Sequence, residues 1–167
     1  MPIRHDLCVV LGAAVAWSCA ARMAPARPPG ADGREPVAGQ AVSGPDDAEI
    51  IVFLTLVRVT RADAGCRPLA WDARIAAVAA KHSADMAERG YFSHTNPDGR
   101  SPFDRLRDAG LRFRAAAENI AKAVGAQTIH DNWLASPGHR ANMLDCSFTH
   151  HGIGRAGAFW THVFVQR

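Results

Sequence analysis

The sequence predicts an α+β domain in which helices come first and a β-hairpin comes last. Apolar residues recur at spacings of three and four over residues 72–90, which is typical of an amphipathic helix. Two strand-like runs, 151–155 and 159–165, are joined through Gly157, which is typical of a hairpin. The chain has 167 residues, of which 48% are hydrophobic, and this suits one domain plus appendages.

The start of the chain resembles an export signal. In residues 1–20, an apolar run from 7 to 17 is too short for a comfortable membrane span and is followed by small residues. We therefore expect a signal peptide, a secreted protein and no transmembrane span in the mature form. The alternative is a lipid anchor on Cys19, although Trp17 fits such a signal poorly. Residues 21–46 are rich in Pro, Gly and Ala and predict a flexible tether.

Export to an oxidising compartment would decide the state of the cysteines. Cys8 and Cys19 lie in the signal, which leaves Cys66 and Cys146 in the mature domain. Two remaining thiols in an oxidising compartment usually form a disulfide. This bond would close a loop of about 80 residues and contribute about 4 kcal/mol. The alternative is a pair of buried free thiols. A cysteine metal site is disfavoured because the chain has no CxxC pair.

The charge pattern indicates no nucleic-acid partner. The formal net charge is only +3, from 19 Lys and Arg against 16 Asp and Glu. The basic residues are scattered along the sequence rather than gathered in a stripe, so they show no footprint for a nucleic acid.

The first two helices are predicted from their ends. Asp46 and Asp47 can cap a helix that runs through residues 50–57 and whose end is marked by Gly65 and Pro68, although its β-branched residues leave a strand as an alternative. The clearer helix follows Asp72, a good N-cap, and ends at Gly90. His82 lies on its apolar stripe, where a hydrogen-bonded core histidine is more common than a ligand.

The middle of the chain alternates loops and helices. A loop over 93–100 precedes Ser101, which can cap a short helix that ends at Gly110. Residues 113–123 are Ala-rich and carry Glu118, and the pattern assigns them no element. A further helix begins at about residue 127.

Residues 133–144 predict the end of one helix, a Pro-Gly turn and a second short helix. Ser136 is the expected N-cap of that second helix, with a proline at its first position. Asn142 is expected to bond the backbone of the turn, and Arg140 to pair with an acid beneath it. This leaves His139 as the residue of the corner that is available for chemistry.

A set of motifs in fixed order carries a resemblance to a known family. The motifs are Ala-Ala-Lys-His-Ser-Ala-Asp-Met (79–86), Ser-His (93–94), Phe-Asp-Arg-Leu (103–106), Glu-Asn-Ile-Ala (118–121), Trp-x-x-Ser-Pro-Gly-His-Arg-Ala-Asn-Met-Leu (133–144), Gly-Ile-Gly (152–154) and Trp-Thr-x-Val-Phe (160–164). Over residues 48–167 the chain resembles the bacterial SCP-like branch of the CAP superfamily, which is related to cysteine-rich secretory proteins, antigen 5 and pathogenesis-related proteins. The resemblance implies a three-layer α-β-α sandwich with a small antiparallel sheet, and a CAP domain over 47–167.

The resemblance also implies a cleft. In eukaryotic relatives two His and two Glu line it and can hold a divalent metal such as zinc. The first His looks like His94 and the first Glu looks like Glu118, whereas Ser136 and Phe159 stand at the other two positions. The cleft-lining candidates are therefore His94, Glu118, Ser136, His139 and His162, and of the neighbouring residues His150 and His151 at most one is expected to reach the cleft.

Three functions follow from this cleft as hypotheses. The first is an extracellular binding module for a lipid, a glycan or a cell-wall component. The second is a hydrolase in which His94, Glu118 and His139 hold zinc, since zinc accepts both ligand types. The third is a disulfide-stabilised scaffold for a protein partner. A serine hydrolase that uses Ser136 or Ser93 with a nearby His is less favoured, because Ser136 has a structural role as a cap. The sequence leaves the ligand and the oligomeric state open.

Overall fold

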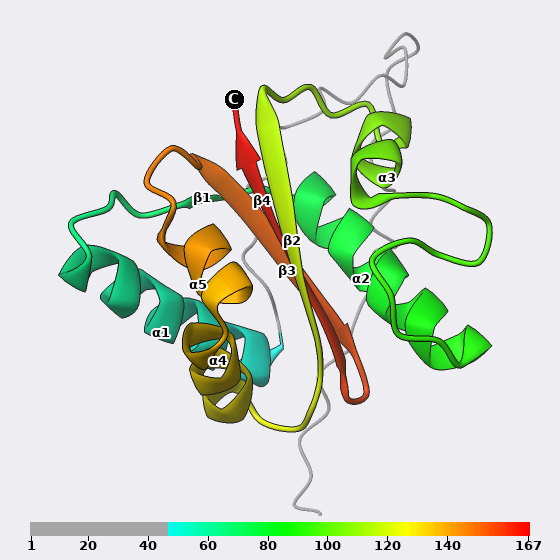
Figure 1. Cartoon of the computed structure of the whole chain (residues 1–167), viewed down its shortest axis with the longest axis horizontal. Coiled ribbons are helices and arrows are strands. Elements are labelled where there is room, and N and C mark those ends of the chain that lie inside the picture. The colour runs from blue at the N-terminus through cyan, green and yellow to red at the C-terminus, as the bar shows by residue number, and fades with distance from the viewer. Residues whose placement is uncertain (1–46) are drawn as a thin grey trace, which may run out of the picture. The chain divides into compact units, whose positions relative to one another are not determined.

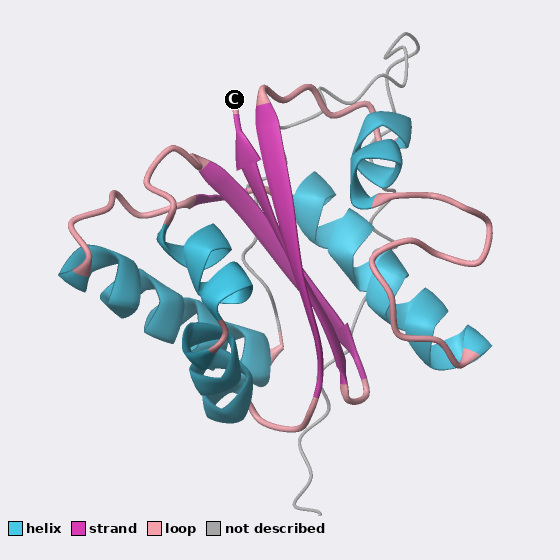
Figure 2. Ribbon diagram, in the orientation of Figure 1, coloured by secondary structure: helices cyan, strands magenta, loops and turns pink. Residues whose placement is uncertain are grey.

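The computed structural model describes residues 47–167, which form a four-stranded sheet between two layers of helices (Figures 1 and 2). The elements are α1 (Ala48–Asp63), β1 (Ala70–Trp71), α2 (Ala73–Arg89), α3 (Pro102–Asp108), β2 (Ala115–Lys122), α4 (Ala126–Ala135), α5 (Pro137–Leu144), β3 (His150–Ala156) and β4 (Phe159–Gln166). The predicted α+β class and sandwich are confirmed. The predicted signal peptide and tether lie outside the described residues.

The sheet has the strand order β1-β3-β4-β2. β3 and β4 form the predicted hairpin, and β2 pairs antiparallel with β4 from Ala115 opposite Gln166 to Lys122 opposite Phe159. β1 is parallel to β3, so the sheet is mixed rather than purely antiparallel. The Ala-rich segment to which the sequence assigned no element is therefore a strand, held by eight residues of pairing with β4.

The predicted helix ends are confirmed by hydrogen bonds. Asp47 Oδ1 accepts from the backbone N–H of the first turn of α1, so the first apolar segment is a helix rather than a strand. Asp72 caps α2 in the same way, and Gly90 ends it at a φ of 68°. Ser101 and Asp104 form a reciprocal capping box at the start of α3.

The strand β4 separates two apolar cores. Both of its faces are buried, as expected of a central strand. One core lies between the sheet and the helices α1, α4 and α5, and it contains Phe53, Ile129, Trp133, Met143, Trp160 and Phe164. The other core lies between the sheet and the helices α2 and α3, and it contains Ile75, Val78, Leu106, Val163 and Val165.

Helix α2 lies very close to the backbone of β3. A Cβ atom at Gly152 would lie 2.2 Å from the Ala76 backbone nitrogen, and one at Gly154 would lie 2.4 Å from the Ala80 Cα. Only glycine leaves room for the helix at these two positions. The Gly-Ile-Gly motif therefore sets the spacing between α2 and the sheet.

The ends of α1 and α5 are tied together twice. Cys66 and Cys146 form the predicted disulfide, which excludes the alternative of two free thiols. Beside it, the buried guanidinium of Arg61 donates to the carbonyl oxygens of Arg67 and Met143, the latter at 2.7 Å. This arginine therefore has its charge compensated by backbone dipoles within the core.

Candidate functional site

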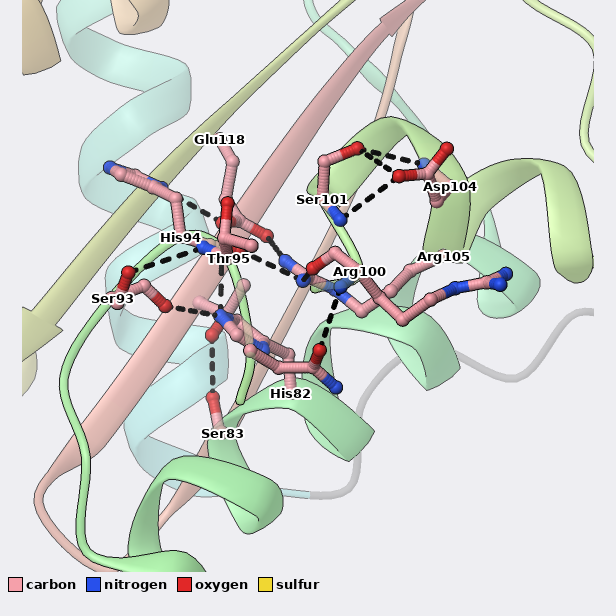
Figure 3. Close-up of polar contacts among 12 residues, drawn as sticks. His82, Ser83, Ser93, His94, Thr95, Arg100, Ser101, Asp104, Arg105 and Glu118 are labelled. Carbon is pink, nitrogen blue, oxygen red and sulfur yellow. Dashed lines mark hydrogen bonds and ion pairs between the residues drawn. The ribbon is translucent and has the colours of Figure 1, made fainter. Parts of the chain in front are cut away.

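The centre of the candidate site is the carboxylate of Glu118 on β2 (Figure 3). Its side chain is 2% exposed, and it faces α2 and α3. Oε1 lies 2.9 Å from His94 Nδ1, and Oε2 accepts from Arg105 Nη2 at 2.7 Å. The structure thus joins His94 and Glu118, two residues that lie 24 positions apart in the sequence.

The His94 ring is held at one nitrogen and open at the other. Its Nδ1 contacts the Glu118 carboxylate, which accepts hydrogen bonds only, so the neutral ring carries its proton on Nδ1. Figure 3 shows the far side of the ring pointing away from the network, and the side chain is 49% exposed. Nε2 is therefore an oriented acceptor of a proton or a hydrogen bond.

Arg105 on α3 holds the loop that carries His94. Its Nη1 donates to the carbonyl oxygens of His94 and Arg100, each at 2.9 Å, while Nη2 binds Glu118. Arg105 is a residue of the site that the sequence does not single out. Its only signal in the sequence is its place in the Phe-Asp-Arg-Leu motif. Because the chain has 17 arginines, one more arginine in a motif does not stand out.

His82 on α2 lies behind this pair as a core histidine, as predicted. Its Nε2 is 3.0 Å from the Ser93 carbonyl oxygen and 3.9 Å from Glu118 Oε1. Burial lowers the pKa of His82, and the Glu118 carboxylate opposes this shift only in part. The ring is therefore neutral at pH 7 and donates from Nε2 to Ser93, which fixes the base of the loop.

A second group comes from the corner between α4 and α5. Ser136 Oγ lies 2.9 Å from His139 Nδ1. Ser136 occupies the N-cap position of α5 but makes no side-chain cap, so the predicted capping bond is wrong: the hydroxyl bonds the imidazole instead. Burial lowers the pKa of His139, and the neighbouring His94 lowers it further, which keeps the ring neutral at pH 7.

The corner is fixed to β2 by a pair of asparagines. Asn119 Nδ2 donates to the His139 carbonyl oxygen at 3.0 Å, and Asn142 Nδ2 donates to Asn119 Oδ1 at 2.8 Å. The prediction that Asn142 itself bonds the turn backbone is wrong, because Asn119 makes that bond. Arg140 is exposed, so it does not lie beneath the cleft as predicted. Neighbouring strand residues face opposite ways, so Glu118 and Asn119 point to opposite sides of β2. Because β2 is the edge strand of the sheet, the two groups approach each other across its outer edge, where His94 is close enough to lower the pKa of His139.

His162 does not line this cleft, contrary to prediction. It is fully buried on the Asn119 side of the sheet, against Phe53 and Trp133. Its Nε2 is 3.0 Å from Nδ1 of His151, which is also buried. His150 bonds Thr149, so neither member of the His150–His151 pair joins His94 and Glu118.

The donors do not fit a metal centre. Glu118 already contacts His94 through one oxygen and the Arg105 cation through the other, and a metal at this carboxylate would lie beside that guanidinium. Within residues 47–167 no group of three His, Cys, Asp or Glu side chains is placed to hold an ion. The zinc set of His94, Glu118 and His139 thus gains no support from the geometry.

A hollow of about 270 Å³ opens next to the network on its α2 side. It is lined by Lys81, His82, Asp85, Asn96 and Arg105. Asp85 accepts from Tyr91 Oη at 2.5 Å and from Asn96 Nδ2 at 3.4 Å. Each of these five side chains ends in a group that can form hydrogen bonds, so the hollow offers donors and acceptors to a ligand.

The sandwich, the buried Glu118 and the glycine-spaced α2 define an SCP-type domain. The model of the cysteine-rich secretory protein family, CAP, matches residues 54–166, and the chain belongs to this family. None of the helices described over residues 47–167 is long and apolar enough to cross a membrane.

Relatives and solved structures agree with this assignment. The YkwD protein of Bacillus subtilis is 36% identical over 115 residues, which are 67% of this chain and 45% of that protein. An extracellular SCP-domain protein of Bacillus anthracis is 34% identical, with a TM-score of 0.65 over 75% of this chain and 45% of the other. An outer surface protein of Borrelia burgdorferi shares the fold, with a TM-score of 0.68 at 18% identity over 71% of this chain and 92% of the other. The chain spans less than half the length of the Bacillus subtilis relative.

Proposed function

We propose that this protein is an exported binding module that holds a hydroxyl-rich ligand, a cell-wall glycan, at the face formed by His94, Glu118 and His139. The observation that carries the proposal is the fixed orientation of His94. Its Nδ1 is held by a buried carboxylate and its Nε2 faces outward. Sugar hydroxyls both donate and accept hydrogen bonds, so they match a surface of fixed donors and acceptors.

The rigidity of the face favours binding. Arg105 fixes the His94 loop at two carbonyl oxygens, and Asn119 fixes the His139 corner. A ligand therefore meets groups that lose little freedom when it binds. The residues around the neighbouring hollow all carry hydrogen-bonding groups, which a glycan can use and a hydrocarbon chain cannot.

Export is part of the proposal. The signal-like residues 1–20 and the disulfide between Cys66 and Cys146 both suit an oxidising compartment. The Bacillus anthracis relative is described as extracellular. Mass spectrometry of the mature N-terminus distinguishes a free secreted chain from one that carries lipid on Cys19.

The test is a binding measurement on the mature chain. We expect it to co-sediment with purified cell-wall glycan, and His94→Ala to weaken that binding at least about tenfold, as expected when a central hydrogen-bonding group is removed. His150→Gln is the matched control, since it removes a part-exposed imidazole outside the site. Equal binding by the wild type and His94→Ala contradicts the proposal.

The same geometry supports a second candidate, a hydrolase. A histidine whose Nδ1 is oriented by a carboxylate and whose Nε2 faces the ligand is the arrangement of a general base. In that case the purified chain releases soluble sugar fragments from the cell wall, and His94→Ala abolishes the release. Binding without release identifies a binding module. Release that persists in His94→Ala contradicts the hydrolase.

A further inference from the structure

Four arginines from three separate segments of the sequence surround one hollow. Its volume is about 480 Å³, and its walls are Arg74, Gly110, Arg112, Phe113, Arg114 and Arg167. Arg74 lies in the first turn of α2, and Arg167 follows β4. In Figure 1 these segments meet at the end of the sheet marked C. We call this feature the arginine hollow.

The segment that connects α3 to β2 is held so that two arginines face outward together. Leu111 is buried, and its N–H bonds the Leu106 carbonyl oxygen at 3.1 Å. The N–H of Arg114 bonds the Gln166 carbonyl oxygen at 2.8 Å. With Leu111 and the half-buried Phe113 packed inward, the exposed residues Arg112 and Arg114 alternate with them.

The positive charge of the hollow is largely uncompensated. Asp72 forms ion pairs with both Arg74, at 3.8 Å, and Arg167. None of the ion pairs formed among residues 47–167 involves Arg112 or Arg114. Arg74 and Arg167 share the single carboxylate of Asp72, and Arg112 and Arg114 add two further positive charges without an ion pair among the described residues.

We propose that the arginine hollow binds consecutive phosphate groups of a linear inorganic polyphosphate chain. The planar guanidinium donates two parallel hydrogen bonds to such an oxyanion. The hollow of about 480 Å³ has room for a segment that carries more than one phosphate group. Its one aromatic ring, Phe113, already lies beneath Arg107 at 5.6 Å, so it offers no stacking platform for bases.

The arginine hollow shares no residue with the site of His94, Glu118 and His139, so it stands apart from the proposed function. The probe is fluorescently labelled inorganic polyphosphate, added to the mature chain with its disulfide intact. We expect saturable binding whose logarithmic affinity falls linearly with the logarithm of salt concentration. His94→Ala is expected to bind polyphosphate as tightly as the wild type.

The decisive comparison is between two double variants that have the same net charge. The double variant Arg112→Gln/Arg114→Gln is expected to weaken polyphosphate binding at least about tenfold, since each charged contact contributes to affinity. The control variant Arg58→Gln/Arg140→Gln removes two exposed arginines elsewhere and is expected to change affinity less than about twofold. Circular dichroism checks that both variants remain folded.

Several results overturn the proposal. Equal weakening by the two double variants shows attraction to the whole molecule rather than to the hollow. Tighter binding of single-stranded DNA of equal charge shows a nucleic-acid site, and tighter binding of phosphatidylglycerol vesicles shows a membrane surface. Orthophosphate that competes as well as the polymer shows a site for one ion. Absence of polyphosphate binding at low salt also overturns it.

Discussion

His151 Nδ1 on β3 lies 3.0 Å from His162 Nε2 on β4, inside the core beneath α1. Burial lowers the pKa of His151 to about 4, and both burial and the neighbouring His151 hold the pKa of His162 well below its usual range. The pair is therefore neutral at pH 7. A proton on either ring removes the acceptor of the shared hydrogen bond or places a charge in the core.

This pair makes stability depend on pH. The unfolded chain binds protons at these histidines below about pH 6.5, whereas folded His151 stays neutral down to about pH 4. The stabilisation is therefore complete above pH 6.5 and is lost as the pH falls toward 4. We expect the free energy of unfolding to fall by about 2 to 3 kcal/mol from His151 alone over this range, measured by urea unfolding.

Two variants test the assignment to His151. His151→Gln keeps a hydrogen-bonding side chain beside His162 but cannot titrate, so its stability should fall less steeply between pH 6.5 and 4. His150, on the adjacent position of β3, is only half-buried, and burial lowers its pKa too, so His150→Gln should change the slope less than His151→Gln does. An unchanged slope in His151→Gln would place the pH dependence elsewhere.

Gly154→Ala is expected to destabilise the fold by about 3 kcal/mol. The added methyl group meets the Ala80 backbone of α2 at 2.4 Å, and a helix backbone cannot yield as a flexible side chain can. Gly138→Ala in α5 is the matched control. No atom lies within 4 Å of a Cβ there and alanine favours helix, so its stability should rise by less than about 1 kcal/mol. Thermal unfolding compares the two, and equal effects would contradict the close-packing explanation.

Asn142→Ala is expected to lower the free energy of unfolding by about 1 to 3 kcal/mol. Asn119 is fully buried, and the variant removes the donor to its Oδ1. Asn132→Ala, an exposed asparagine on α4, should change stability by less than about 0.5 kcal/mol. Urea unfolding measures both, and no difference between them would show that the asparagine pair does not hold the corner.

Reduction of the disulfide is expected to lower the free energy of unfolding by about 4 kcal/mol, because the bond joins residues 80 positions apart and restricts the unfolded chain. The double variant Cys66→Ser/Cys146→Ser should reproduce the loss and make the chain insensitive to reductant. The comparison is urea unfolding of both chains with and without reductant. A reductant effect that persists in the double variant would assign it to another group.

Local signals were enough to predict most helices. Asp47, Asp72 and Ser101 mark helix starts because each satisfies free N–H groups with its own side chain. The sequence does not predict β2, because this segment is rich in alanine, which favours helix. The strand forms because it pairs with β4, about 40 residues further along the chain. β1 is two residues long and leaves no periodic signal.

The site was predictable in part. The family motifs brought His94 and Glu118 together, but they did not indicate that Arg105 holds the second oxygen of the carboxylate. The sequence predicts the wrong environment for His162, because it does not show which residues of β2 and β4 lie opposite each other. In the sheet Glu118 lies opposite Val163, so the side chains of Glu118 and His162 point to opposite faces. The arginine hollow had no linear signal, since its residues come from three separate segments.

Strand β2 ends the sheet on one side, and side chains close its outer rim. The indole nitrogen of Trp133 donates to the Ile120 carbonyl oxygen at 3.2 Å, and Asn119 ties the His139 backbone across the same strand. A strand from another molecule would have to displace these groups before it paired with β2. The indole of Trp133 and the corner between α4 and α5 therefore obstruct the addition of a further strand at this edge of the sheet.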